Sequence, residues 1–213
     1  MIIKVCGMRD AENIRDIEKL GVDWMGFIFY PKSPRFVSEI PAYLPTRAKR
    51  VGVFVNESIK NILKTVKLFQ LDFVQLHGDE SPEFCDEIGD NGLKIIKAFS
   101  IENEFPSEKV NTYHGKCDYI LFDTRTNLHG GSGKKFNWDI LSDYRGETPF
   151  LLSGGISPDD IHAVKSFSHP KCIGIDINSK FEIGPALKDA ELVKQFIDKI
   201  REPRLIDNRL VDN

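Results

Sequence analysis

The chain has 213 residues, and 41% of them are hydrophobic, which is enough for one core but cramped for two independent domains. Its formal net charge of −3, from 29 basic and 32 acidic residues spread along the sequence, argues against a nucleic-acid groove. No apolar run reaches the length of a membrane span and Met1–Cys6 is too short for a signal peptide, so we expect a soluble, cytoplasmic protein.

Short apolar segments that alternate with helix-forming segments organise the chain. Strands are predicted at Ile2–Cys6, Trp24–Phe29, Val51–Val55, Phe73–Leu76, Leu93–Phe99, Tyr119–Phe122, Phe150–Leu152 and Cys172–Ile177. A first helix begins near Asp10 and ends at Gly21. Further helices are predicted at Ile59–Phe69, Pro82–Ile88, Trp138–Tyr144, Pro158–Phe167 and Ala190–Ile200. The segments after the second and fifth strands show no clear helical pattern, and Pro41 and Pro45 interrupt the former.

Near-continuous apolar strands separated by helices are typical of a parallel sheet that is covered on both faces. Eight such units predict an α/β protein with one (β/α)8 TIM barrel, residues 1–213, and an open doubly wound sheet is the alternative. The active site of such a barrel lies at the carboxyl ends of its strands. Polar residues that follow the strands would therefore converge there: Cys6, Arg35, His77, Asp123, Gly154–Gly155 and Asp176–Ser179.

Two late loops suggest a phosphate site. Gly154 and Gly155 follow the seventh strand and precede a predicted helix, so their backbone N–H groups can approach an anion. Asp176, Asn178 and Ser179 end or follow the eighth strand, and phosphate sites of these barrels are often built from the last two loops. The alternative is that the two glycines only form a tight turn.

Asp123 and Cys6 are the candidates for acid–base chemistry. Asp123 ends an apolar strand ahead of a glycine-rich loop at 130–133, and burial that raised its pKa would make it a proton donor. The Cys6 thiol, with its pKa depressed by a positive environment, could serve as a base or nucleophile. Loop capping by Asp123 and simple burial of Cys6 are the alternatives.

Arg35 and His77 are candidates for contacts with the substrate. The Arg35 guanidinium could hold a carboxylate in bidentate geometry, although a loop arginine is more often solvated. For His77 we favour a structural or orienting role. No His, Cys or Asp cluster has metal-ligand spacing and no dinucleotide fingerprint follows the first strand, so neither a metal nor a cofactor is indicated. The four cysteines predict no disulfide framework, and the sequence does not indicate an oligomeric state.

Taken together, these motifs resemble the phosphoribosylanthranilate isomerase family over nearly the whole chain. The resemblance lies in Lys4-Val5-Cys6-Gly7, Gly26-Phe27-Ile28-Phe29, Ser33-Pro34-Arg35-Phe36-Val37, Gln75-Leu76-His77-Gly78, Asp123-Thr124, Gly130-Gly131-Ser132-Gly133 and Ser153-Gly154-Gly155. It implies a TIM barrel of tryptophan biosynthesis that works without a cofactor. The reaction it implies is the Amadori rearrangement of N-(5-phosphoribosyl)anthranilate to 1-(2-carboxyphenylamino)-1-deoxyribulose 5-phosphate.

The resemblance also implies roles for the candidate residues. Asp123 is expected to protonate the furanose oxygen, and Cys6 to remove the C2′ proton. The remaining expectations concern the small phosphorylated substrate: Arg35 near the anthranilate carboxylate, Gly154, Gly155, Asn178 and Ser179 around the phosphate, and Asp176 near the sugar hydroxyls.

The eighth loop departs from the family pattern. Where the family usually reads Ser-Ser-Gly-Val-Glu and then Pro-Gly, this chain has Asn178-Ser179-Lys180-Phe181-Glu182 and Pro185-Ala186. Losing a glycine limits the backbone angles available to the loop, and Lys180 is not assigned as a ligand.

Two other functions are considered. The first is a histidine-pathway aminoaldose phosphate isomerase, whose sites resemble a pair of aspartates; Cys6 argues against it. The second is a non-catalytic phosphate-binding barrel, which would keep the late loops without needing an acid–base pair.

Overall fold

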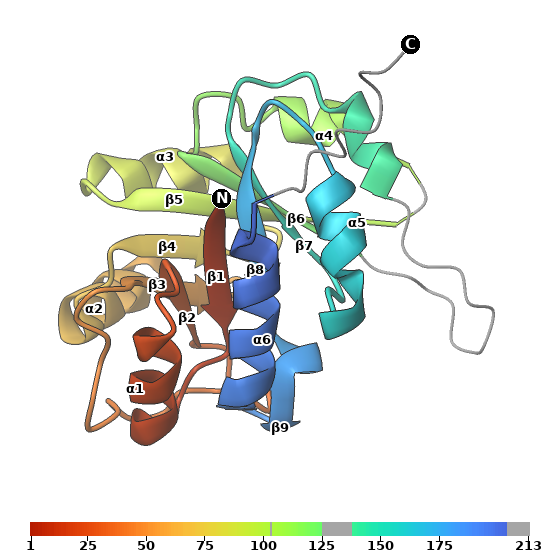
Figure 1. The fold of residues 1–213 in the computed structure, drawn as a ribbon. Coiled ribbons are helices and arrows are strands. Elements are labelled where there is room, and N and C mark those ends of the chain that lie inside the picture. Colours follow the sequence, from red (N-terminus) through yellow and green to blue (C-terminus); the bar gives the residue numbers. More distant parts are fainter. Residues whose placement is uncertain (103, 125–137, 204–213) are drawn as a thin grey trace, which may run out of the picture.

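Eight parallel strands close into one barrel, in which each strand pairs with the next along the chain and β1 pairs with β8 (Figure 1). The computed structural model describes residues 1–102, 104–124 and 138–203. The strands are β1 (Ile2–Cys6), β2 (Trp24–Ile28), β3 (Lys49–Phe54), β4 (Phe73–Leu76), β5 (Lys94–Ile101), β6 (Tyr119–Thr124), β7 (Phe150–Ser153) and β8 (Cys172–Ile177). The predicted TIM barrel is confirmed, and closure excludes the open doubly wound sheet.

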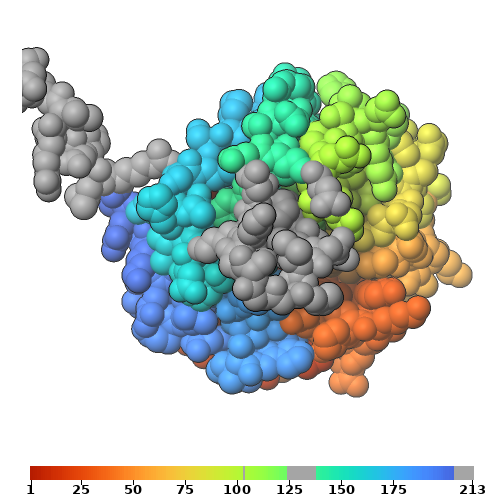
Figure 2. Space-filling view, turned by 90° about the vertical axis from the view of Figure 1, so that its right-hand side faces the viewer, coloured from red at the N-terminus to blue at the C-terminus, as the bar shows by residue number. Residues whose placement is uncertain are grey.

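Helices connect most strands and surround the barrel (Figure 1). They are α1 (Ala11–Lys19), α2 (Ile59–Phe69), α3 (Pro82–Asp90), α4 (Ser107–Asn111), α5 (Ile161–Ser166) and α6 (Ala190–Arg201). Four helices begin where the side chain of an N-cap residue accepts a backbone N–H three residues later, and the cap residues are Asp10, Ser58, Ser81 and Asp189. Figure 2 views the molecule from one side of Figure 1 and shows the described segments following one another around this face in chain order.

The later connections contain short helices. The segment predicted as a helix at Trp138–Tyr144 is the 3-10 helix η1 (Trp138–Asp143), and the one at Pro158–Phe167 divides into η2 (Pro158–Asp160) and α5. Aspartate and serine are frequent in both segments, and these residues compete with helical hydrogen bonds through their own side chains. After β8 come η3 (Ser179–Phe181) and a hairpin of β9 (Glu182–Gly184) and β10 (Leu187–Lys188).

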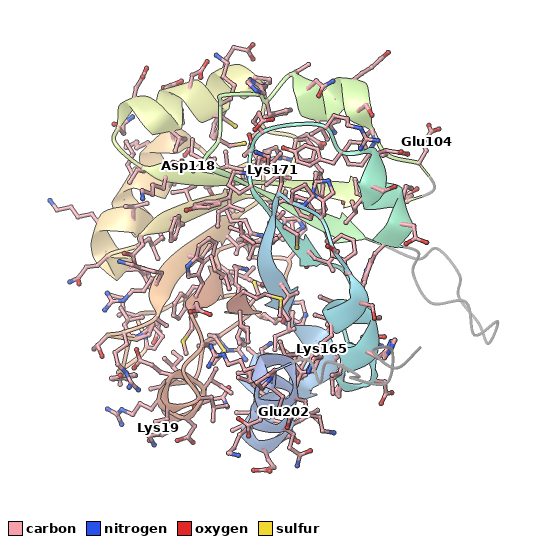
Figure 3. All side chains as sticks on the ribbon, turned by 45° about the horizontal axis from the view of Figure 1, so that its top comes forward. Lys19, Glu104, Asp118, Lys165, Lys171 and Glu202 are labelled. Carbon is pink, nitrogen blue, oxygen red and sulfur yellow. The ribbon has the colours of Figure 1, made fainter. Side chains whose placement is uncertain are left out.

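Charged side chains extend from the outer helices, among them Lys19 and Lys165 (Figure 3). Lys19 projects from α1 and is 69% exposed. Lys165 of α5 donates to the backbone oxygen of Lys199 at 2.9 Å and to that of Glu202 at 3.1 Å. This contact ties α5 to the end of α6.

No helix lies between β2 and β3, so this connection departs from the (β/α) repeat. The prolines at positions 41 and 45 remove backbone donors and fix φ, which prevents a continuous helix. Glu18 of α1 fixes the connection instead: its Oε1 accepts the backbone N–H groups of Thr46 at 2.7 Å, Arg47 at 2.6 Å and Ala48 at 3.2 Å. Its Oε2 accepts the hydroxyl of Tyr43.

The barrel interior changes from apolar to polar along the strands. An apolar cluster fills it: Trp24, Val51, Phe73, Ile96, Ala98, Leu121 and Leu151. Alternate residues of a strand face the same side, so Gln75, Asp123 and Ser153 follow Phe73, Leu121 and Leu151 on the interior face. Lys4 and Cys6 share this face on β1. The polar side chains are therefore collected at the carboxyl ends of the strands.

We predict that Glu18→Gln lowers the free energy of unfolding by about 1–3 kcal/mol in urea denaturation at neutral pH, because the buried amide cannot replace a carboxylate that binds several donors. Burial raises the pKa of Glu18, but hydrogen bonds from Tyr43 and the backbone lower it more, so the pKa lies below its usual value. The stabilisation is present above the unfolded-state pKa and is lost as pH falls through the folded-state pKa, so the variant and the natural protein should converge in acid.

Glu12→Gln is the matched control, because the Glu12 side chain on the same helix is 76% exposed. It should change the free energy of unfolding by less than about 0.5 kcal/mol. Equal effects of the two substitutions would show that Glu18 does not anchor the connection.

Candidate active site

Cys6 lies at the carboxyl end of β1 and is 4% exposed. Gly26 on the neighbouring β2 makes room for it, because a Cβ at position 26 would lie 2.7 Å from the Cys6 Sγ. Any larger residue at position 26 would displace the thiol, so both strands define its position.

A buried ion pair lies beside Cys6. Lys4 precedes it by two residues on the same strand face, and the Lys4 Nζ lies 2.8 Å from the Oδ1 of Asp176 on β8. The Lys4 side chain is 0% exposed and that of Asp176 is 7% exposed. The other carboxylate oxygen of Asp176 accepts the Ser153 hydroxyl of β7 at 3.3 Å. Asp176, expected near the sugar hydroxyls, thus has both oxygens in contacts within the barrel.

The electrostatic surroundings of Cys6 contain charges of both signs. Burial raises the pKa of the thiol, the Lys4 and Lys188 ammonium groups lower it, and Asp176 raises it further, with a net increase above the usual value. The positive environment expected around Cys6 is therefore present, but the expected depression of its pKa is wrong, because desolvation of the thiolate outweighs the two cations.

Asp123 lies at the end of β6, with its side chain 18% exposed. The Nε2 of His77 is 3.2 Å from its Oδ2, and the Nδ1 of His77 is 2.9 Å from the Nε2 of Gln75. The Gln75 amide donates to Nδ1, which leaves Nε2–H to donate to Asp123. His77 thus lies between Gln75 and Asp123.

A path of neighbouring strands connects Asp123 with Cys6. Asp123 is paired in register with Ser153, whose hydroxyl binds Asp176, and Asp176 in turn binds Lys4. The acid and base candidates thus belong to one polar layer that spans β6, β7, β8 and β1.

Arg35 binds a carboxylate of the protein itself. Its Nε lies 2.8 Å from the Oε1 of Glu182, and its Nη2 lies 2.6 Å from the Oε2. The Lys188 Nζ also contacts the Glu182 Oε1, at 2.6 Å, and the Asn178 Oδ1, at 2.7 Å. Burial raises the pKa of Glu182, but Arg35 and Lys188 lower it more, so that it lies below its usual value. Glu182 therefore occupies the edge of the Arg35 guanidinium that carries Nε and Nη2.

Gly7 allows these groups to meet next to Cys6. Its φ is +78°, in the left-handed region, and a Cβ there would lie 2.6 Å from the Arg35 Cδ and 2.8 Å from the Asn178 Oδ1. The absence of a side chain at Gly7 thus lets the loops after β2 and β8 approach the end of β1.

The two candidate phosphate loops follow neighbouring strands, β7 and β8. Gly154 and Gly155 have φ values of 100° and 68°, and a Cβ at Gly155 would meet nothing within 4 Å. Asn178 precedes η3, in which Ser179 and Lys180 are exposed. Ala186 takes a left-handed φ of 65° without glycine, and its N–H contacts the Glu182 Oε1 at 3.2 Å. The loop therefore adopts a left-handed backbone angle at position 186 although glycine is absent there.

Other predicted features can be compared only within the described residues. The glycine-rich loop at 130–133 and the whole segment 125–137 lie outside them. Among residues 1–102, 104–124 and 138–203, no group of at least 3 His, Cys, Asp or Glu side chains is arranged to hold a metal ion. No helix in the described part of the chain is both long and apolar enough to cross a membrane. All four cysteines are free thiols.

Sequence reasoning missed Lys4, Lys188 and the contacts of Glu182. One signal for Lys4 was available: a lysine two residues before Cys6 in an apolar strand must share its face. Lys188 and Glu182 gave no comparable signal, since they meet Arg35 through a hairpin that the sequence did not predict.

The fold and site define an enzyme of the TIM-barrel class, with a thiol, a carboxylate and buried charges at the active end. The model of the family "N-(5'phosphoribosyl)anthranilate (PRA) isomerase" matches residues 3–199. The N-(5'-phosphoribosyl)anthranilate isomerase of Phocaeicola vulgatus is 54% identical over 95% of this chain and 98% of its own, and that of Parabacteroides distasonis is 48% identical over 98% and 97%. The chain belongs to this isomerase family.

Solved structures agree with this assignment. Phosphoribosyl anthranilate isomerase from Thermotoga maritima aligns with a TM-score of 0.78 at 34% identity, covering 94% of this chain and 98% of that one. A crystal structure of a phosphoribosyl anthranilate isomerase in complex with reduced 1-(o-carboxyphenylamino)-1-deoxyribulose 5-phosphate aligns with a TM-score of 0.78 at 32% identity, with the same coverage.

We predict that Gly7→Ala raises the KM for the substrate at least about 10-fold, because its Cβ would displace Arg35 and Asn178, and about 1.4 kcal/mol of lost binding corresponds to that factor. Steady-state kinetics of the folded variant measure this effect.

Gly115→Ala is the matched control: its φ is +74°, but its Cβ would meet nothing within 4 Å. It should lower the free energy of unfolding by about 1 kcal/mol through backbone strain and leave KM unchanged. An unchanged KM in Gly7→Ala would exclude crowding at this position as a determinant of binding.

Proposed function

We propose that this chain catalyses the Amadori rearrangement of N-(5'-phosphoribosyl)anthranilate to 1-(2-carboxyphenylamino)-1-deoxyribulose 5-phosphate, a step of tryptophan biosynthesis, with Asp123 as acid and Cys6 as base. Membership of the isomerase family supports the reaction. The observation that carries the two roles is the polar layer that joins Asp123 with Cys6 across four neighbouring strands. The rearrangement requires one proton donor and one proton acceptor, and a carboxyl group and a thiol can supply them.

Ring opening is the first step. Protonated Asp123 donates its proton to the furanose oxygen, the bond from that oxygen to C1′ breaks, and the anthranilate nitrogen forms a Schiff base with C1′. The Nε2 of His77 lies 3.2 Å from the Asp123 Oδ2, a contact that supports a fixed orientation of the carboxyl group. The histidine thus acts on orientation and does not need to transfer a proton.

Proton abstraction follows. The Cys6 thiolate takes the proton from C2′, the C–H electron pair forms the C1′–C2′ double bond, and the Schiff-base nitrogen becomes a neutral amine. The resulting enol takes a proton from water at C1′ and releases its hydroxyl proton to water, giving the ketone, while Asp123 regains a proton and Cys6 loses one in the same way. Each step moves only protons and electron pairs, so the chemistry needs no metal and no cofactor.

The remaining residues bind the ends of the substrate. The cationic groups of Arg35 and Lys188, gathered on Glu182, provide the positive field for the anthranilate carboxylate. Gly154 and Gly155 offer backbone donors to the phosphate, together with the loop of Asn178 and Ser179. Asp176, held by Lys4, is the candidate for contact with the sugar hydroxyls.

The histidine-pathway alternative receives no support from this site. The end of β1 carries Cys6 instead of the first member of an aspartate pair. A non-catalytic barrel is likewise disfavoured by the family, whose named members are enzymes. The organisation as one catalytic domain over residues 1–213 and the cytoplasmic location stay predictions.

We predict that Asp123→Asn and Cys6→Ser each lower kcat by about 100-fold or more while the protein stays folded, because neither the amide nor the hydroxyl transfers a proton effectively near neutral pH. Turnover of synthesised substrate, with circular dichroism as the test of folding, measures both. A folded Asp123→Asn variant with normal kcat would remove Asp123 as the acid, and a fully active Cys6→Ser variant would move the base elsewhere.

We also predict that inorganic phosphate competes with the substrate, because the loops after β7 and β8 present backbone donors to an anion. Gly155→Asp should weaken this inhibition by at least about 10-fold, since it places a negative charge in the open space beside Gly155. Asp159→Asn, at an exposed position beyond the loop, is the control and should leave inhibition within about 2-fold. Non-competitive inhibition, or equal effects of both variants, would rule out this phosphate site.

A further inference from the structure

A second buried ion pair joins Lys97 of β5 with Glu80, which lies just ahead of α3. The Lys97 Nζ is 3.1 Å from the Glu80 Oε2, and each side chain is 2% exposed. Ile96 and Ala98 belong to the interior cluster, so Lys97 between them points to the opposite face, toward the helices. The proton transfers described above use neither residue. A buried ion pair often adds little net stability by itself, and this one is distinguished by the backbone groups that it also binds.

The pair holds both peptide groups that flank His77. The Lys97 Nζ lies 3.2 Å from the backbone oxygen of Leu76, which belongs to the peptide group before His77. The Glu80 Oε2 accepts the backbone N–H of Gly78 at 3.0 Å, and that N–H belongs to the peptide group after His77. Planar peptides leave each residue only φ and ψ as soft torsions. Holding the two peptide groups therefore fixes the direction in which the His77 side chain leaves the backbone.

Further contacts keep the pair and this loop together. The Lys97 Nζ also lies 2.8 Å from the backbone oxygen of Gly78. The Glu80 Oε1 accepts the backbone N–H of Asn56, in the loop after β3, at 2.8 Å. The backbone oxygen of Glu80 in turn accepts the hydroxyl of Tyr113 at 2.6 Å. The ion pair thus connects the carboxyl ends of β3, β4 and β5.

His77 carries this placement to the acid candidate. Its Nε2 lies 3.2 Å from the Asp123 Oδ2, and its Nδ1 lies 2.9 Å from the Nε2 of Gln75, two residues earlier on β4. The imidazole therefore bridges its own strand and β6. A rotation of either peptide group beside His77 would swing the ring away from Asp123.

We propose that Glu80 and Lys97 are positioning residues for the ring-opening step: they fix the backbone on both sides of His77 and thereby hold its imidazole against the Asp123 carboxyl group. This inference rests on the proposed function, in which Asp123 is the acid. Neither Glu80 nor Lys97 needs to touch the substrate, because the effect passes through His77.

Glu80→Gln is the variant that tests this role. The carboxylate accepts donors at both oxygens, so in either orientation the NH2 group of the amide would face a donor. Glu18→Gln is the matched control, because Glu18 is also a buried carboxylate that accepts several backbone N–H groups, but it serves the connection between β2 and β3. Both substitutions should lower the urea midpoint of unfolding.

Two readouts separate positioning from stability. The first is the long-range proton–nitrogen NMR spectrum of the histidine rings, in which the His77 signals are assigned by their absence from His77→Ala. Glu80→Gln should shift these signals, and Glu18→Gln should leave them in place. The second is steady-state kinetics: Glu80→Gln should lower kcat about 10-fold or more and change KM by less than about 3-fold, because the acid is misplaced while the binding groups stay. Glu18→Gln should leave both constants unchanged.

A combined substitution tests the path through His77. Glu80→Gln in the His77→Ala background should lower kcat by less than about 2-fold further, since the side chain that Glu80 positions is already absent. Losses that multiply in full would show that Glu80 acts by another route and would overturn the inference.

In a folded Glu80→Gln protein, unchanged His77 signals would overturn the inference, and so would an unchanged kcat if Asp123→Asn is inactive. Lys97→Met should reproduce the effects of Glu80→Gln, and it decides alone if Glu80→Gln does not fold. Loss of folding in both variants would also overturn the inference, because the pair would then serve folding only. Failure of the proposed function looks different: the His77 signals would shift as expected while a folded Asp123→Asn protein kept its normal kcat. That result would leave the placement of His77 in force but remove its role in ring opening.

Discussion

The ion pair between Lys4 and Asp176 is the interaction on which the rest of the site depends. It lies where the first strand pairs with the last, so the contact that helps to close the barrel also helps to position the Cys6 thiol. Breaking a buried pair by removing one partner typically costs about 3–5 kcal/mol, because a charge is left without compensation. The strands on either side must therefore stay in register for the charges to be tolerated, and that register sets the positions of Cys6, Ser153 and Asp123.

A second cluster surrounds Glu182 at the mouth of the barrel. Arg35 and Lys188 both bind its carboxylate, and Asn178 shares Lys188. The three elements that supply these groups are loops or a short hairpin, which have few backbone hydrogen bonds to keep them in place. The ion pairs that Glu182 forms with Arg35 and Lys188 hold these elements in place instead. They also fix the geometry of the Arg35 and Lys188 cations in the free protein.

The barrel was largely predictable from sequence, because fully buried parallel strands must be apolar throughout, and runs such as Phe73–Leu76 and Cys172–Ile177 have the observed bounds. The absence of a helix after β2 was only partly predictable. The prolines indicate that the segment does not form a continuous helix, but the hydrogen bonds from its backbone to Glu18 are tertiary contacts that no local sequence pattern predicts. At the site, Cys6 and Asp123 could be chosen as candidates because they lie at the carboxyl ends of their strands. The direction in which the Cys6 pKa shifts could not be predicted, because the shift is the difference between the effect of desolvation and the effects of several charges from distant segments.

The separation of Lys4 from Asp176 by 172 positions has a consequence for biosynthesis. A ribosome completes the N-terminal strand long before the residue that neutralises its lysine has been made. Until then, burying β1 in a partial barrel would leave an ammonium group in an apolar interior, which strongly disfavours such an intermediate. The same charge therefore keeps the nascent chain from settling early into an incomplete barrel, and it couples final closure to the arrival of the eighth strand.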